Sequence, residues 1–119
     1  MKIKFLFLGV CSLLFQCRNM YKEPFVNITH QVAEVHFERP MTQELLNEIK
    51  TKLEAEGIII NYTTINWDGK LLSKLGFEII DNKGRRGAAT TNFVNLRGKA
   101  FGFRVDLGSG NGGLIVGDL

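Results

Sequence analysis

The stretch that decides the fold runs from residue 42 to residue 84 and reads TQELLNEIKTKLEAEGIIINYTTINWDGKLLSKLGFEIIDNKG. Its first part predicts a helix over residues 42–56. Thr42 is a favourable N-cap residue, and Gly57 is placed to end the helix in a left-handed conformation. Between them, apolar residues recur at spacings of three and four, which is typical of one buried helical face. These residues are Leu45, Leu46, Ile49 and Leu53.

The second part of the stretch predicts two strands joined by a tight turn. Residues 58–67 are rich in β-branched and aromatic side chains, which favour strands. Asp68-Gly69 is a strong hairpin turn, and residues 71–81 return with apolar side chains on one face. A further turn follows at residues 82–84.

Shorter strands outside this stretch complete the expected sheet. Residues 31–38 alternate apolar and polar side chains, which is the pattern of a half-buried strand. Three later segments also favour strands, over residues 86–93, 101–107 and 114–116. Short turns require antiparallel pairing. We therefore expect an α+β fold in which one helix packs on an antiparallel sheet of about five to six strands, a two-layer sandwich.

The N-terminus has the pattern of an export signal. Lys2 and Lys4 form a basic start, and an apolar run of eleven residues follows over 5–15. That run is too short to span a membrane, which takes about 20 residues. The expected organisation is a signal peptide, a tether and a single α+β domain, over residues 1–17, 18–29 and 30–119.

The end of the apolar run, LLFQC at residues 13–17, is similar to the lipobox of bacterial lipoproteins. In that motif the cysteine is lipidated and becomes the new N-terminus, so Cys17 is the expected lipidation site. Lipidation would hold the domain at a membrane face, because each buried methylene of an acyl chain contributes about 0.8 kcal/mol. Phe15 and Gln16 stand where the motif usually has small residues. Plain secretion and an uncleaved anchor are the alternatives, although the usual small-x-small cleavage site is absent.

Charge and cysteine content exclude several classes of function. The net charge of +3 comes from 15 Lys and Arg against 12 Asp and Glu, and without Lys2 and Lys4 the balance is 13 against 12, or +1. No clustered basic stripe is present, and the one tight basic pair, Arg85-Arg86, is expected to be solvated, so we expect no nucleic-acid partner. Both cysteines precede residue 18, so the expected domain has no disulfide, thiolate zinc site or cysteine nucleophile.

Several pieces of the chain together are similar to one known module. They are residues 41–50 (MTQELLNEIK), Glu56-Gly57-Ile58, Asn61-Tyr62 and Asp81-Asn82-Lys83-Gly84. With the order strand, helix, strands, they resemble the small extracytoplasmic module in the C-terminal, non-catalytic part of BlaR-type membrane metallopeptidases of Bacteroidetes-type bacteria. The resemblance covers about residues 31–106, and it implies a free-standing envelope relative of a sensor or accessory domain. The peptidase signature His-Glu-x-x-His is absent, so no catalytic role follows.

The glycine-rich segment GSGNGG at residues 108–113 matches G-x-G-x-x-G as a string. Only six residues follow it, which leaves no room for the helix that would hold a pyrophosphate. We interpret it as a hairpin loop in which Gly108, Gly110 and Asn111 are candidates for presenting backbone N–H groups to an anionic ligand. Asp106 before the loop hints at calcium, but Gly108 and Gly110 stand where side-chain ligands are needed.

Two further groups are candidate sites. Trp67, beside the expected hairpin turn, is either an exposed binding aromatic or a residue packed across its partner strand. Glu34, His36 and Glu38 share one face of the first expected strand and are weak candidates for zinc ligands. The favoured interpretation of these three is a solvated polar face, and we expect neither a metal nor a cofactor.

These observations favour a non-enzymatic cell-envelope lipoprotein, or a secreted protein, whose domain binds an unidentified protein or envelope ligand. No serine after the signal lies in a G-x-S-x-G elbow. One alternative is a small secreted enzyme or inhibitor acting on peptides or cell-wall material, which requires a concave site with converging polar groups. Another is a strand-adding interaction module, which the glycine-rich final hairpin suggests.

Overall fold

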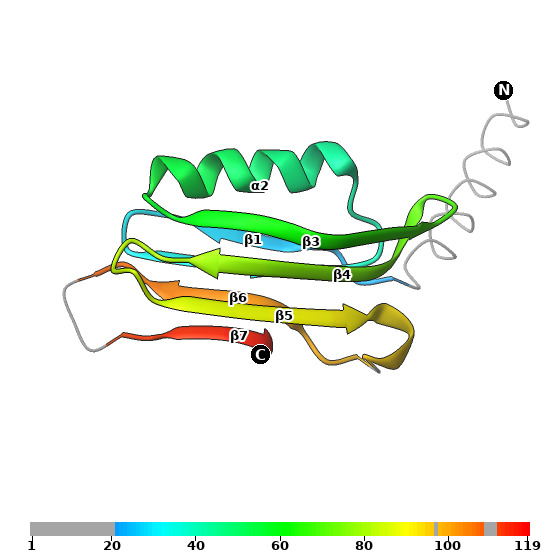
Figure 1. The fold of residues 1–119 in the computed structure, drawn as a ribbon. Helices are drawn as coiled ribbons and strands as arrows, with labels where there is room; N and C mark the ends of the chain where they lie inside the picture. Colours follow the sequence, from blue (N-terminus) through cyan, green and yellow to red (C-terminus); the bar gives the residue numbers. More distant parts are fainter. Residues whose placement is uncertain (1–20, 97, 109–111) are drawn as a thin grey trace, which may run out of the picture.

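The computed structural model describes residues 21–96, 98–108 and 112–119, and among them it contains one α-helix and seven strands (Figure 1). Two strands precede the helix and five follow it. A short 3-10 helix, η1, lies between the fifth and sixth strands. The elements are β1 (Phe25–Ile28), β2 (Val32–His36), α2 (Gln43–Ala55), β3 (Ile59–Asp68), β4 (Leu71–Ile80), β5 (Arg86–Asn92), η1 (Phe93–Asn95), β6 (Phe101–Asp106) and β7 (Leu114–Asp118).

The strands form two antiparallel sheets, sheet A with the order β1-β2-β6-β7 and sheet B with the order β3-β4-β5. The chain leaves sheet B at η1, where Phe93 is buried, and enters sheet A at β6. Strand β6 therefore pairs with β2, which precedes the helix, and not with β5. The predicted α+β class with one helix and antiparallel strands is confirmed. The expectation of a single sheet of five or six strands is wrong.

Helix α2 begins and ends where the sequence predicts, within one residue at each end. The side-chain oxygen of Thr42 accepts a hydrogen bond from the backbone N–H of Leu45 at 3.1 Å, which caps the first turn. Gly57 has a φ of 79°, and beyond the helix the N–H of Ile58 donates to the carbonyl of Leu53 at 2.9 Å. The buried face of the helix consists of Leu46, Ile49 and Leu53.

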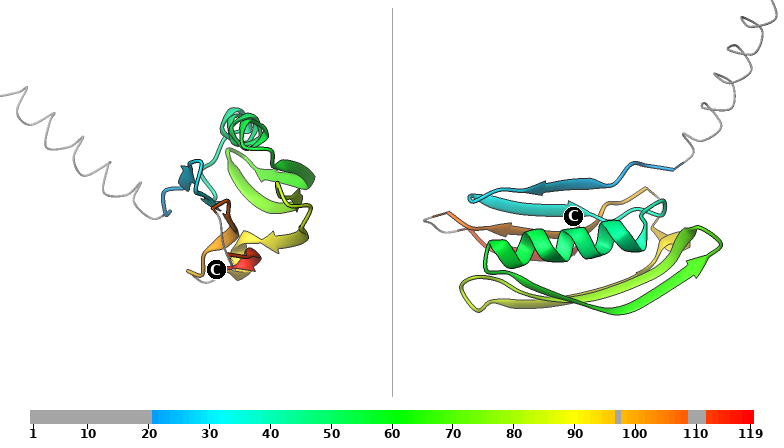
Figure 2. Two further views of the ribbon diagram at one scale, coloured as in Figure 1. Left: turned by 90° about the vertical axis from the view of Figure 1, so that its left-hand side faces the viewer. Right: turned by 90° about the horizontal axis from the view of Figure 1, so that it is seen from above.

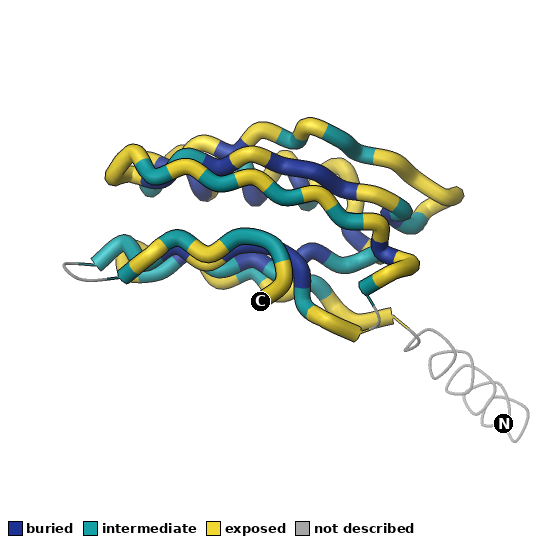
Figure 3. The backbone as a smooth tube through the Cα atoms, turned by 60° about the horizontal axis from the view of Figure 1, so that its bottom comes forward, coloured by how far each residue is buried: buried dark blue, intermediate teal, exposed yellow. Residues whose placement is uncertain are grey.

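The helix and the two sheets enclose one apolar core (Figures 2 and 3). Four of its five phenylalanines contact one another between the two sheets, and the ring centroids of their contacting pairs are 5.4–6.3 Å apart. Phe37 follows β2, Phe77 belongs to β4, and Phe101 and Phe103 belong to β6. Such pairs contribute about 0.5–1.5 kcal/mol beyond their buried area. The phenylalanine cluster therefore joins the two sheets.

Strands β5 and β7 lie side by side and close the core opposite the helix (Figure 2). A Cβ atom on Gly87 of β5 would lie 2.9 Å from a methyl carbon of Val116 of β7. The missing side chain thus lets the two sheets approach. On the other side of the core, α2 contacts both β1 and β3.

Residues 25–28, which were expected within the tether, form β1 instead. Val26 and Ile28 pack against the core, whereas Phe25 and Asn27 are exposed. All four residues pair with β2. The expected start of the domain at residue 30 is therefore too late, because a strand of four residues is too short to give a clear alternating pattern.

The turns gather at two ends of the molecule, because the strands run along its length (Figure 1). The tip of the β3–β4 hairpin and η1 lie at one end, and Tyr21 lines a hollow there with Val94 of η1, so this end is called the Tyr21 end. The β1–β2 turn and the β4–β5 turn lie at the other, where Lys83 donates to the carbonyl of Gly108, and this end is called the Asp81 end. Within the described ranges, no helix has the length and hydrophobicity that a membrane crossing requires.

Candidate functional site

The outer face of sheet A carries the candidate site. Along β2, the buried Val35 lies between Glu34 and His36, and strand alternation turns these two side chains away from the core. The register with β6 places Arg104 opposite Glu34 and Gly102 opposite His36. Two neighbouring strands therefore bring a carboxylate, an imidazole and a guanidinium to one face.

Glu34 is the centre of a polar group that also contains His36 and Arg104, here called the Glu34 cluster. Its Oε2 atom lies 2.7 Å from Nε2 of His36, and its Oε1 atom lies 3.8 Å from Nε of Arg104. The side chains of Glu34 and His36 are 22% and 27% exposed, whereas that of Arg104 is 59% exposed. The carboxylate thus holds His36 by a hydrogen bond and lies near Arg104, whose side chain stays largely open to a partner.

Apolar side chains border the Glu34 cluster on both sides. The Phe25 ring lies 4.9 Å from the His36 ring, centroid to centroid. On the opposite edge, Ile115 of β7 pairs with Arg104, and Leu119 follows that strand. Phe25, Ile115 and Leu119 are 44%, 53% and 40% exposed. A hollow of about 310 Å³ is lined by Glu34, His36, Arg104, Ile115, Asp118 and Leu119.

The weak zinc candidates Glu34, His36 and Glu38 are not arranged as a ligand set. His36 bonds to Glu34, whereas Glu38 lies beyond the end of β2 and lines a second hollow with Lys22 and Arg39. Burial raises the pKa of the Glu38 carboxyl, and the charges of Lys22 and His36 only partly oppose this. Among the residues that the structure describes, no three His, Cys, Asp or Glu side chains are placed to hold a metal ion.

Hydrogen bonds hold the glycine-rich segment at Gly108 and at Gly112, on either side of residues 109–111. The N–H of Gly108 donates to Oδ1 of Asp106 at 3.0 Å, and its carbonyl accepts from Nζ of Lys83 at 3.2 Å. The carbonyl of Gly112 accepts from the Arg85 guanidinium, and a Cβ atom at Gly112 would collide with Asp106. The N–H of Gly108, a candidate anion donor in the sequence, is therefore already bonded within the protein.

Arg85 pairs with the buried carboxylate of Asp81, an arrangement that the sequence patterns did not reveal. Oδ1 of Asp81 accepts from the backbone N–H groups of Lys83 at 2.9 Å and Arg85 at 2.8 Å, and Oδ2 pairs with Nε of Arg85. Burial alone would raise the pKa of Asp81, but these hydrogen bonds outweigh it and bring the pKa below the ordinary value of 3.8. The expectation that Arg85 is solvated is wrong, because its side chain is 31% exposed and bonded to a carboxylate.

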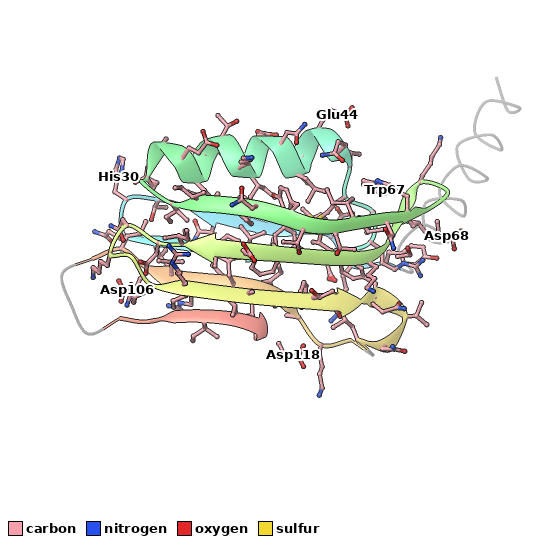
Figure 4. The ribbon with its side chains drawn as sticks, in the orientation of Figure 1. His30, Glu44, Trp67, Asp68, Asp106 and Asp118 are labelled. Carbon is pink, nitrogen blue, oxygen red and sulfur yellow. The ribbon has the colours of Figure 1, made fainter. Side chains whose placement is uncertain are left out.

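Of the remaining candidate residues from the sequence, Trp67 is described by the structure and three others are not. Trp67 lies near the end of β3, opposite Leu72, and is 38% exposed at the Tyr21 end (Figure 4). Gly110, Asn111 and Cys17 lie outside the described residues. Their predicted roles in ligand binding and lipidation remain predictions from sequence.

Comparison with known proteins identifies no relative of the chain. No family model, no curated protein and no solved structure matches the chain. The resemblance to the BlaR-type module therefore remains a hypothesis based on sequence motifs. Any assignment of function must rest on the chemistry of the chain's own residues.

Proposed function

We infer that the chain is a non-enzymatic, exported binding module of the bacterial cell envelope. It is anchored by lipid at Cys17 and binds a protein partner through the outer face of sheet A. The observation that carries the binding part is the placement of the Glu34 cluster between exposed apolar side chains, Phe25 on one edge and Ile115 with Leu119 on the other. The resemblance to an accessory module of an envelope sensor supports the same class of function.

The chemistry of this face suits a protein partner. A partner that covers Phe25 and Ile115 would gain binding free energy of about 25 cal/mol for each Å² of apolar surface removed from water. The Arg104 side chain is 59% exposed, so its planar guanidinium can pair with a carboxylate of the partner. Aromatic residues and arginine are also enriched among the residues that dominate binding energy in interfaces. We therefore expect a partner with an acidic group next to an apolar patch.

Partner binding is tested by capture from envelope extracts with the full-length protein, followed by affinity measurement with the purified partner. Ile115→Ser and Arg104→Glu should each weaken binding at least about tenfold, or about 1.4 kcal/mol. Ile59→Ser is the matched control, because Ile59 is 50% exposed and lies on sheet B, whereas Ile115 is 53% exposed and lies on sheet A. If a partner binds the Ile115→Ser and Arg104→Glu variants as tightly as the unchanged protein, the outer face of sheet A is not its binding surface.

Lipid anchoring is tested separately, in cells that make the full chain. Palmitate should label the protein, and globomycin should block removal of residues 1–16. Cys17→Ser should abolish the label, whereas Cys11→Ser should keep it, because Cys11 lies inside the expected signal. A mature protein without label would reject lipidation of Cys17, and it would not bear on binding through the outer face of sheet A.

A strand-adding function is the second candidate, and a feature of β1 favours it. Among the described strands, β1 pairs with β2 alone, and its other side borders a groove of about 410 Å³ beside α2, lined in part by Val26, Lys52 and Ala55. An extended peptide can bind such an edge through backbone hydrogen bonds. The final hairpin is a poorer acceptor, because β5 lies beside β7. Ala55→Trp should fill the groove and block strand addition without disturbing binding at Ile115.

A further inference from the structure

We propose that the Tyr21 end of the domain lies against the surface of the lipid bilayer. This proposal rests on the proposed lipidation of Cys17 and adds an orientation to it. Its structural basis is a set of exposed apolar side chains and basic side chains, which gather where the described chain begins. Tyr21, Trp67 and Val94 are the apolar members, with exposures of 39%, 38% and 68%.

The start of the described chain is held on the body of the domain at this end. Nζ of Lys22 donates to the carbonyl of Gly98 in the β5–β6 connection at 2.6 Å. The guanidinium carbon of Arg39 lies 5.4 Å from the centroid of the Tyr21 ring, a cation–π contact. Any tether that precedes Tyr21 must therefore leave the domain from the Tyr21 end, and not from the Asp81 end.

The length of the tether limits the distance to the membrane. Tyr21 follows Cys17 by four residues, and four residues span at most about 14 Å when fully extended. A lipid on Cys17 places that residue at the boundary between lipid and water. The Tyr21 end must then lie within about 14 Å of the boundary, a distance at which exposed side chains can reach the headgroups.

The residues at this end have the chemistry that membrane interfaces favour. Tyr and Trp are enriched at the headgroup level, because one part of each ring is apolar and the other polar. Basic side chains near an anionic leaflet contribute about 1 kcal/mol each. Among the described residues at this end, the basic side chains are Lys22, Arg39, Lys70 and Lys99, and the acidic ones are Glu23, Glu38 and Asp68. The balance is only slightly basic, so the apolar contact of Tyr21, Trp67 and Val94 provides most of the expected attraction.

This orientation leaves the other proposed surface free. The Glu34 cluster lies on the outer face of sheet A, and Gly108 accepts a hydrogen bond from Lys83 of the β4–β5 turn at the Asp81 end. A domain seated on its Tyr21 end would therefore hold the outer face of sheet A on its side, open to a partner, and the β4–β5 turn away from the membrane.

The test uses the fluorescence of Trp67, the single tryptophan of the chain. The full-length lipidated protein is reconstituted into vesicles of phosphatidylethanolamine and phosphatidylglycerol, with or without phospholipids brominated high on the acyl chains. We expect the brominated lipids to lower Trp67 emission at least about twofold. The matched control is the Trp67→Phe/Asn82→Trp protein, which carries its tryptophan in the exposed β4–β5 turn at the Asp81 end and should keep its emission.

A second pair of variants tests the apolar contact itself. Val94→Asp should reduce the quenching of Trp67, because it places a charge in the proposed contact, whereas Ile59→Asp should not, because Ile59 lies at the start of β3, toward the Asp81 end. Equal quenching at both tryptophan positions would overturn the proposed orientation. So would the absence of Trp67 quenching in a protein that carries the palmitate label, and in both cases the lipidation of Cys17 would still hold. A protein without label would overturn both.

Discussion

Arg85 forms an ion pair with the buried carboxylate of Asp81 and ties the β4–β5 turn to the β6–β7 hairpin. The Asp81 side chain is 0% exposed, and the guanidinium of Arg85 that pairs with it also donates to the carbonyls of Gly112 and, at 3.3 Å, Asp106. One arginine thus joins sheet B to sheet A at the Asp81 end. A buried charge that loses its partner is strongly destabilising, so stability should depend on both members of the pair.

Replacing Arg85 by methionine should lower the free energy of unfolding by about 3–5 kcal/mol, because the Asp81 carboxylate is left buried without its cation. Urea denaturation followed by circular dichroism measures the change. Lys52→Met is the control, since Lys52 and Glu48 form an exposed pair at 3.3 Å whose loss should cost about 0.5 kcal/mol or less. If the two variants lose the same stability, the Asp81–Arg85 pair does not hold the sheets together.

The same pair predicts how stability depends on acid. Burial opposes ionisation of Asp81, but its hydrogen bonds to Arg85 and Lys83 hold the pKa below the ordinary 3.8. As the pH falls below that ordinary value, the unfolded chain takes up a proton that the folded protein does not. The contribution of Asp81 is therefore complete above its unfolded pKa and is lost as the pH falls through its folded pKa.

Urea titrations at a series of acidic pH values measure this loss. The Asp81→Asn protein should be less stable near neutral pH, and its stability should fall less steeply with acid, because it has no carboxyl at this position. Parallel curves for Asp81→Asn and the unchanged protein would contradict the assignment.

Local signals explain what the sequence predicts well. Thr42, the apolar spacing and Gly57 lie within one short segment, so the helix is predicted within one residue at each end. The β3–β4 hairpin follows from Asp68-Gly69 for the same reason, and the structure pairs the two strands around that turn. These elements depend on neighbours in the chain, which a pattern in the sequence can show.

Long-range pairing explains what the sequence does not predict. Alternation along β2 predicts that Glu34 and His36 share a face, but only the register with β6 and β7 brings Arg104 and Ile115 beside them. No local pattern predicts that β6 pairs with β2, a strand that precedes the helix in the sequence. Nor does any local pattern predict that the strands divide into two sheets at η1. The contact of Arg85 with Gly112 escapes prediction likewise, because the two residues meet only when both hairpins are folded.

Gly102 should tolerate no side chain, because a Cβ atom there would collide with the backbone carbonyl oxygen of Val35 on the neighbouring strand. Backbone in the middle of a paired sheet cannot move aside as a flexible side chain can. Gly102→Ala should therefore destabilise the protein by about 3 kcal/mol, at the upper end of overpacking effects. Gly113→Ala is the control, since a Cβ atom at Gly113 meets nothing within 4 Å. Equal melting temperatures for the two variants would show that β2 and β6 can separate slightly at no cost.

Tyr62 links β3 to the helix through one half-buried hydrogen bond. Its hydroxyl donates to the carbonyl of Leu46 at 2.8 Å, and burial raises the pKa of the phenol above its ordinary 10.0. Tyr62→Phe should cost about 0.5–1.5 kcal/mol in urea denaturation, because the carbonyl loses this donor.

The raised pKa also predicts an alkaline weakness. The unfolded chain releases the Tyr62 proton near the ordinary pKa of 10.0, whereas the folded protein keeps it, so the free energy of unfolding should fall as the pH rises through that value. Denaturant titrations at increasing alkaline pH measure the fall, and absorbance of the phenolate reports when Tyr62 ionises. In the Tyr62→Phe protein this part of the pH dependence should be missing. A phenolate that forms at the ordinary pKa without any loss of structure would mean that Tyr62 is not held between β3 and α2.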